Sequence, residues 1–331
     1  MFRIDDATAA SSLPTPEAAG TEGYFTEGNP ATGTPATLER ASWFNMVQEE
    51  LRAIVVAGGL TPSKTTYTQV RDAILQLIQG GAGVTPIIGS VRNLAMTVAT
   101  ASATATITAD EIVIGSALGG SKLTLGAFNK SINLATVGVN AGVGGMDTGT
   151  APANSFVGIY GIGNPLTGAA ALLGQSANGV ILPNVYGGGH MPAGYTESAL
   201  LTVVPTNASS QFSPCVVMDR AVDFNGSSIL STSTTAASPT IVNNLVVPLN
   251  AKNCTGFMQI GNSAAASVAM ALLSSSAGTG TQSIALTLNA SGSIASPFNK
   301  LKITVGQRVF YTGSSSAGTP TFSAQVTSYE I

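Results

Sequence analysis

The chain has 331 residues, of which 44% are hydrophobic and only 9% are charged, and its net charge is −3. That length allows two or three domains with buried cores, and the hydrophobic content argues against a disordered chain. A typical soluble domain carries about 25% charged residues, so Ser, Thr, Asn and Gly must cover most of this surface, and the absence of a Lys/Arg cluster argues against nucleic-acid binding.

Residues 1–41 are rich in Pro, Gly, Thr and acidic residues. Pro14, Pro16, Pro30 and Pro35 exclude a long helix in this segment. The N-terminal MFRIDDATAA has acidic residues where a secretory signal needs a basic start and an apolar run. We therefore expect an extended docking arm that is ordered by a partner, in a protein made in the cytoplasm.

The next segment, residues 42–81, predicts a helical hairpin. One apolar stripe, at a spacing of three and four, predicts a helix over 42–57 with Ser42 as its N-cap and the two glycines at 58–59 as its stop. A second helix is predicted over 66–79, ended by the glycines at 80–81. The hairpin is too small to be stable alone, which indicates oligomerisation or docking. The first stripe consists of Trp43, Val47, Leu51, Ile54 and Val55.

Beyond residue 82 the apolar period changes from that of a helix to that of a strand. We expect a linker over 82–103 and a β-rich middle domain over 104–234. Turn residues separate the expected strands. These cover 103–116, 121–139 (two strands with a turn near Asn129), 155–163, 170–176, 195–207, 212–226 and 227–234.

A seam near residues 234–240 separates this region from the last part of the chain. Residues 235–331 contain six or seven short strands at regular spacing, separated by turn residues, and this pattern is typical of a β-sandwich. The expected fold is therefore mainly β, with a small N-terminal α-helical hairpin.

The residues that catalysis would need are sparse. His190 is the single histidine, and no GxSxG, HExxH, Walker A or paired-Cys motif is present. We therefore expect no enzyme, no cofactor and no metal site; a His190 metal site on a threefold axis is a minor alternative. Cys215 and Cys254 have no CxxC spacing and are expected to be buried free thiols. No apolar run reaches the roughly 18 residues that span a bilayer, so no membrane insertion is expected.

Residues 20–80 resemble the N-terminal region of tail fibre proteins of tailed bacteriophages and prophages. The motifs that carry the resemblance are GYFTEGNPATGTPAT at 23–37, ASWFNMVQEELRAIVVAGGLTP at 41–62 and TYTQVRDAIL at 66–75. A second stretch, from TADEIVIG through GGMDTGT to PAGYTESALL, is similar to the shaft and knob region of the same proteins. It departs from them at Ser155–Phe156, where the relatives often have a Trp-Tyr-Tyr strand. The last 90 or so residues match no family motif.

The resemblance implies a homotrimeric fibre in the virion tail, built from β-sandwich domains. Its N-terminal region would attach to baseplate or tail-tip proteins, and its distal part would contact a bacterial surface glycan or protein receptor. We expect tail docking through Tyr24, Phe25, Pro30, Trp43, Val47 and Leu51. Packing inside the hairpin is the alternative role of Trp43. Since aromatic rings stack on sugars, Tyr311, Phe322 and Tyr329 are receptor-contact candidates, with burial in the sandwich core as the alternative.

Two other functions compete with a receptor-binding fibre. The chain could be a structural baseplate or tail-tip component that carries a separate receptor-binding protein. It could also degrade surface polysaccharide, which the scarcity of carboxylates after residue 85 disfavours.

Overall fold

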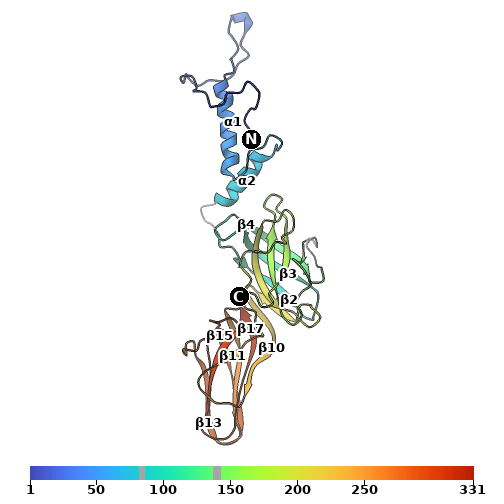
Figure 1. The fold of residues 1–331 in the computed structure, drawn as a ribbon, viewed down its shortest axis with the longest axis vertical. Coiled ribbons are helices and arrows are strands. Elements are labelled where there is room, and N and C mark those ends of the chain that lie inside the picture. The colour runs from blue at the N-terminus through green and yellow to red at the C-terminus, as the bar shows by residue number, and fades with distance from the viewer. Residues whose placement is uncertain (82–85, 137–142) are drawn as a thin grey trace. The chain divides into compact units, whose positions relative to one another are not determined.

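The computed structural model describes residues 1–81, 86–136 and 143–331, and the chain divides into two compact units, Met1–Val84 and Thr85–Ile331 (Figure 1). The first unit holds the helices and the second holds the strands. The predicted class, mainly β with a small N-terminal helical part, is confirmed.

In the first unit a short 3-10 helix, η1 (Pro30–Thr32), precedes α1 (Ala41–Ala57) and α2 (Gln69–Gly81). Both predicted helices form, but the second begins later than expected and includes the glycines that we expected to end it. The prediction of Ser42 as N-cap is wrong, since Arg40 occupies that position without a side-chain hydrogen bond. The Ser42 hydroxyl instead donates to Glu17 Oε1 at 2.9 Å, which ties the arm to the start of α1.

Helices α1 and α2 pack closely where the backbone at Gly58, at the end of α1, approaches the backbone of Ala73 in α2. A Cβ added at Gly58 would lie 2.7 Å from the Cα of Ala73, so only glycine fits at this end of α1. Val55 and Ala73 are fully buried at this contact. Most other large apolar side chains of the unit are partly or largely exposed, so its own core is small.

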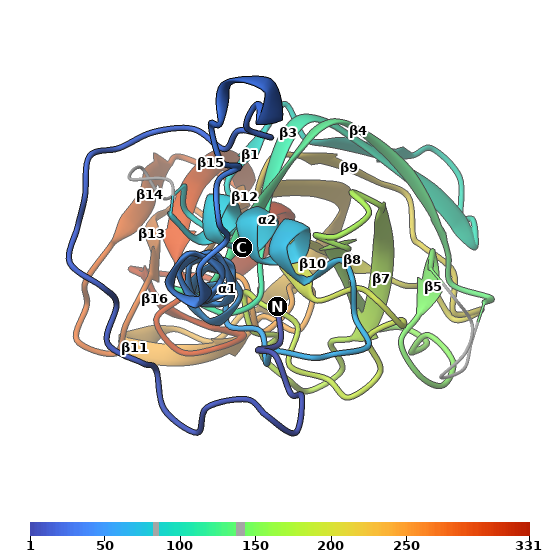
Figure 2. The ribbon, with the colours of Figure 1, turned by 90° about the horizontal axis from the view of Figure 1, so that it is seen from above.

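Among its described residues, the second unit contains a 13-stranded sheet and a four-stranded sheet. Figures 1 and 2 show β3 and β4 as a long curved hairpin, in agreement with their antiparallel pairing. The strands are β1 (Val91–Arg92), β2 (Ala95–Val98), β3 (Thr104–Gly115), β4 (Lys122–Asn133), β5 (Gly145–Met146), β6 (Phe156–Gly163), β7 (Ala170–Ser176), β8 (Glu197–Pro205), β9 (Cys215–Met218), β10 (Ala221–Thr232), β11 (Ala236–Asn243), β12 (Asn253–Asn262), β13 (Ala266–Leu273), β14 (Gln282–Leu288), β15 (Gly292–Lys302), β16 (Arg308–Ser315) and β17 (Pro320–Glu330).

The core of this unit lies on strands without an exposed face. Every residue of β6 is buried, and β8 is buried along all but its last residue. Continuous apolar runs such as SALLTVV suit strands that are covered on both sides. Tyr160 of β6 and Tyr329 of β17 are the largest fully buried side chains among the described residues, and the Tyr160 hydroxyl donates to the carbonyl oxygen of Pro183 at 2.8 Å.

The last third of the chain contributes to both sheets. Strands β15, β12, β17 and β10 are consecutive in the larger sheet, and β11, β16, β13 and β14 make the smaller one. The two sheets touch at Gly313 of β16, where an added Cβ would lie 2.9 Å from the ring of Phe322 in β17. Small residues therefore let the sheets approach closely.

Several predicted strand boundaries differ from the structure. The two strands predicted over 121–139, with a turn near Asn129, are wrong, because one strand, β4 (Lys122–Asn133), pairs with β3 from end to end. Residues 137–139 of that prediction lie outside the described residues. The segment 212–234 breaks at Asp219, whose φ is 51°, and so gives β9 and β10. Strands β1 and β2 lie within the expected linker 82–103.

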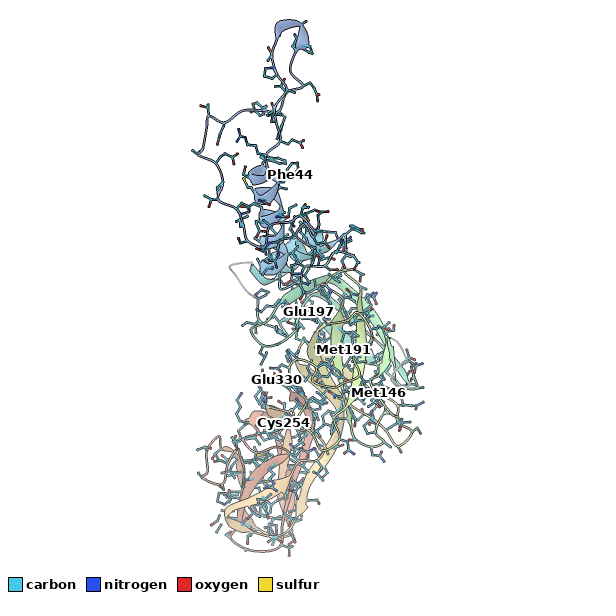
Figure 3. All side chains as sticks on the ribbon, turned by 45° about the horizontal axis from the view of Figure 1, so that its top comes forward. Phe44, Met146, Met191, Glu197, Cys254 and Glu330 are labelled. Atoms are coloured by element: carbon cyan, nitrogen blue, oxygen red, sulfur yellow. The ribbon has the colours of Figure 1, made fainter. Side chains whose placement is uncertain are left out.

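Cys215 and Cys254 are free and buried, as predicted. Burial raises the pKa of the Cys215 thiol to about 11 and that of Cys254 to about 12. Figure 3 labels Cys254 on β12 together with Glu330 of the neighbouring β17. In the part of the chain that the structure describes, no helix has the length and apolar character to cross a membrane.

Candidate functional site

Polar contacts hold the start of the arm on the helices. The guanidinium of Arg3 donates to Glu49 Oε2 at 2.7 Å, and the amide of Ile4 donates to Gln48 Oε1 at 3.1 Å. The Lys64 ammonium donates to Asp5 Oδ2 at 2.7 Å. The hydrogen bond from Arg3 lowers the pKa of the Glu49 carboxyl. These groups are exposed, so each pair contributes little energy alone and serves mainly to set the path of the arm.

An apolar groove lies between the arm and α1. Its volume is about 660 Å³. The Trp43 ring meets Phe25 edge-on with centroids 5.3 Å apart, and it meets Phe44 in the same way at 5.4 Å. Trp43 nevertheless keeps 42% of its surface exposed. Aromatic rings that are half-covered by one another and open on the other side are typical of a binding surface.

A second groove, of about 860 Å³, runs between residues 1–5, α1 and the segment before α2. Phe2, Ile4, Phe44, Val47 and Tyr67 contribute apolar walls to it. The two grooves together form a surface on the first unit that we call the arm–helix surface. Its large apolar side chains, among them Phe25, Phe44 and Tyr67, are exposed rather than buried within the unit.

The predicted docking residues are accessible, but the structure brings only some of them together. Phe25 and Trp43 line the first groove, and Val47 lines the second. Tyr24 is 98% exposed and lines neither groove. Pro30 lies in η1 and is exposed, and Leu51 is half-buried on α1.

Sequence reasoning missed Leu38, Phe44 and Met46, which also line the grooves. Leu38 lies in the irregular arm, where no periodicity marks a face. Phe44 and Met46 lie beside the predicted stripe of α1. Large apolar residues outside the buried stripe of a short helix could have indicated that Phe44 and Met46 belong to a second, exposed apolar surface.

The prediction that Tyr311, Phe322 and Tyr329 contact a receptor is wrong, because all three rings are buried. Strand β17 lies between β12 and β10, and its Phe322 and Tyr329 face the protein interior. Tyr311 of β16 is buried on the smaller sheet, and its hydroxyl donates to Thr234 O at 3.3 Å. The alternative expectation for these three residues, burial in the core, agrees with their exposure in the structure.

A buried polar cluster surrounds Tyr186. Its hydroxyl donates to Asp147 Oδ2 at 2.8 Å, and its ring meets Tyr160 edge-on at 5.4 Å. Burial, together with the Asp147 carboxylate, raises the pKa of Tyr186. His190 is half-buried nearby in the chain, and no group of three or more His, Cys, Asp or Glu side chains suited to a metal occurs within the described residues. The tyrosine–aspartate bond pairs two buried polar groups with each other.

The comparisons with known proteins give a partial match. The chain is 42% identical over 78 residues to the uncharacterized protein StfP of Escherichia coli strain K12. The match covers 24% of this chain and 35% of StfP, so it spans about a third of that relative's length. No family model matches the chain, and no solved structure matches it.

The similarity to StfP therefore concerns a quarter of the chain.

Proposed function

We propose that the chain is a tail fibre protein of a tailed bacteriophage or prophage. Its first unit attaches to baseplate or tail-tip proteins, and its second unit contacts the host cell surface. The observation that carries this proposal is the arm–helix surface, which exposes Phe25 and Trp43 in the segment whose motifs resemble tail fibre N-terminal regions.

The energetics of the first unit support attachment. An exposed apolar surface of this kind is costly in water unless another protein covers it. Aromatic side chains in a pocket supply much of the binding energy of protein interfaces. The polar contacts of Arg3 and Lys64 would hold the arm in place before docking, which lowers the entropy lost on binding.

We further propose a homotrimer located in the virion tail and made in the host cytoplasm. Three copies would give multivalent contact with the host, so that weak single contacts add up to firm attachment. The two sheets that meet at Gly313 and Phe322 would form the β-sandwich of its distal end. In this proposal the chain has no enzymatic activity and no cofactor.

Competition with virions for host cells tests this function. Purified full-length protein is added to cells before the virions that carry the same chain, and free virions are counted. The proposal predicts a dose-dependent fall in adsorption. The variant Phe25→Ser/Trp43→Ser changes only the arm–helix surface and should compete as well as the wild type, because attachment to the tail is not needed for competition.

The alternative function is a structural tail component that carries a separate receptor-binding protein. Burial of Tyr311, Phe322 and Tyr329 favours this alternative, since it removes the predicted receptor contacts. A well-folded full-length protein that neither binds host cells nor competes with virions would support the structural role and contradict the receptor-binding one.

A further inference from the structure

Phe257 is the one aromatic residue with an exposed ring among the described residues of the second unit. It lies on β12 with 49% of its surface exposed, whereas the other aromatic side chains of 86–136 and 143–331 are buried or half-buried. Its neighbours in sequence, Met258 and Ile260, are each 1% exposed and anchor the strand. An aromatic ring held outward by an anchored strand needs an explanation that core packing does not supply.

The surroundings of Phe257 form a defined face. Phe257 is paired with Pro297 of β15 on one side and with Gln325 of β17 on the other. Two residues along β12, Gln259 is paired with Ser323, and its Nε2 donates to Ser293 Oγ at 3.3 Å. We call these six outward residues the Phe257 face.

Local backbone geometry sets the position of the ring. The pairing of β12 with both neighbours is irregular at Gly256, immediately before Phe257. A Cβ at Gly256 would lie within 1.9 Å of the Gln325 carbonyl oxygen, so the strands approach closely only because glycine is present. Bulges of this kind bend a strand and often occur where a side chain is re-aimed next to a binding site.

The chemistry of the Phe257 face points to one class of ligand. Its six residues offer an aromatic ring, a proline ring, two amides and two hydroxyls, and none of them is charged. The nearest ionic pair along these strands, Lys300 Nζ and Glu330 Oε1, is closed upon itself at 2.6 Å. Lys302, at the far end of β15, is exposed but is not one of the six residues of the face. The face itself therefore offers no cation to an anionic polymer, whereas a neutral saccharide presents apolar ring faces and hydroxyl groups that match these partners.

We propose that the Phe257 face binds a neutral saccharide chain, with a sugar ring against Phe257 and its hydroxyl groups bonded to Gln259 and Gln325. This inference rests on the proposed host contact of the second unit and assigns that contact to specific residues. The face is shallow, so each copy binds weakly and several copies together give firm attachment.

Binding of the full-length protein to an array of immobilised neutral oligosaccharides (glucans, galactans and N-acetylglucosamine oligomers) and anionic ones (sialylated and uronic acid oligomers) tests the proposal. Wild-type protein should bind at least one neutral oligosaccharide. Phe257→Ala should weaken that binding roughly tenfold or more, as expected for a central aromatic contact, and Phe257→Tyr should preserve it. Leu245→Ala removes another exposed apolar side chain outside this face and should bind like the wild type.

Circular dichroism and sedimentation establish that each variant keeps its fold and assembly. Three results would overturn the inference: no neutral oligosaccharide binds, only anionic ones bind, or Phe257→Ala binds as tightly as the wild type. Dissociation of the assembly by Phe257→Ala would also overturn it, because the face would then be an interface between copies. If the Phe257→Ala protein still competes with virions for host cells, the proposed host-binding function stands and only the assignment of this site is contradicted.

Discussion

The hydroxyl of Tyr329 donates a hydrogen bond to the carbonyl oxygen of Val203 at 2.6 Å, inside the core. Tyr329 lies near the end of β17, and Val203 lies in β8. The Tyr329 ring also meets Phe156 of β6 edge-on, with centroids 6.3 Å apart. Strand β17 lies in the region that we expected to form a separate C-terminal domain. Tyr329 therefore connects that region to β8 and β6 of the expected middle domain.

Replacement of Tyr329 by Phe leaves the Val203 carbonyl without this buried donor. We expect the unfolding free energy to fall by about 1–3 kcal/mol, measured by urea denaturation. Tyr311→Phe is the matched control, because its hydrogen bond to Thr234 is longer, at 3.3 Å, and should contribute less. Equal losses in the two variants would contradict the role given to Tyr329.

The periodicity of the sequence predicted most elements because it reports burial along each segment. The stripe from Trp43 to Val55 gave α1, and alternation in TATIT gave β3. Periodicity does not report which strands become neighbours, so the position of β17 between β12 and β10 could not be predicted. That position buries Phe322 and Tyr329, which is why these two predicted receptor contacts were wrong. Tyr311 is buried on the smaller sheet, whose pairing periodicity does not report either.

The arm–helix surface was predicted only in part for a related reason. Trp43 belongs to a clear apolar stripe, but Phe25 lies in an irregular arm, and its edge-on contact with Trp43 depends on the path of the chain between them. That path is fixed by contacts such as the hydrogen bond from Ser42 to Glu17, which no spacing rule indicates.

The two cysteines should be unreactive in the folded protein. Burial raises the pKa of Cys215 to about 11 and that of Cys254 to about 12, so almost no thiolate exists at pH 8, and both sulfurs are shielded from reagents. We expect negligible reaction with a thiol reagent under native conditions and complete reaction of both residues in guanidinium. Rapid native labelling of either cysteine would contradict the described core.

Glu197 should make stability fall as the pH rises above the ordinary glutamate range. The side chain is 3% exposed, and its burial raises the pKa of the carboxyl although Ser121 donates to it at 2.7 Å. The folded state therefore binds this proton more tightly than the unfolded state, which favours folding at low pH and disfavours it above the folded pKa. Glu197→Gln should remove this part of the pH dependence in urea titrations from pH 4 to 8.

Glu330→Gln provides the contrast for that experiment. Hydrogen bonds from Lys300 and Asn253 lower the pKa of Glu330, so its contribution is present above the unfolded pKa and is lost as the pH falls through the folded pKa. The difference between wild type and variant should thus have the opposite slope for Glu330→Gln and for Glu197→Gln. Slopes of the same sign would contradict the environment assigned to Glu197.

Trp43 provides an intrinsic signal for docking because it is the only tryptophan in the chain. Its partly exposed ring should be quenched readily by acrylamide in the free protein and should be protected when the arm–helix surface is covered. We expect a blue-shifted, protected emission after the protein is mixed with tail particles that lack the fibre. The same measurement on the variant Tyr67→Ala, which alters the second groove, shows whether docking needs that groove as well. Unchanged quenching in the wild type would contradict docking through Trp43.

An electron cryomicroscopy map of the virion would show directly which of the two units is attached to the tail. We expect the helical unit within the density of the baseplate or tail tip and the β-rich unit projecting away from it. A map in which the helical unit is distal and the β-rich unit is embedded in the tail would contradict this expectation.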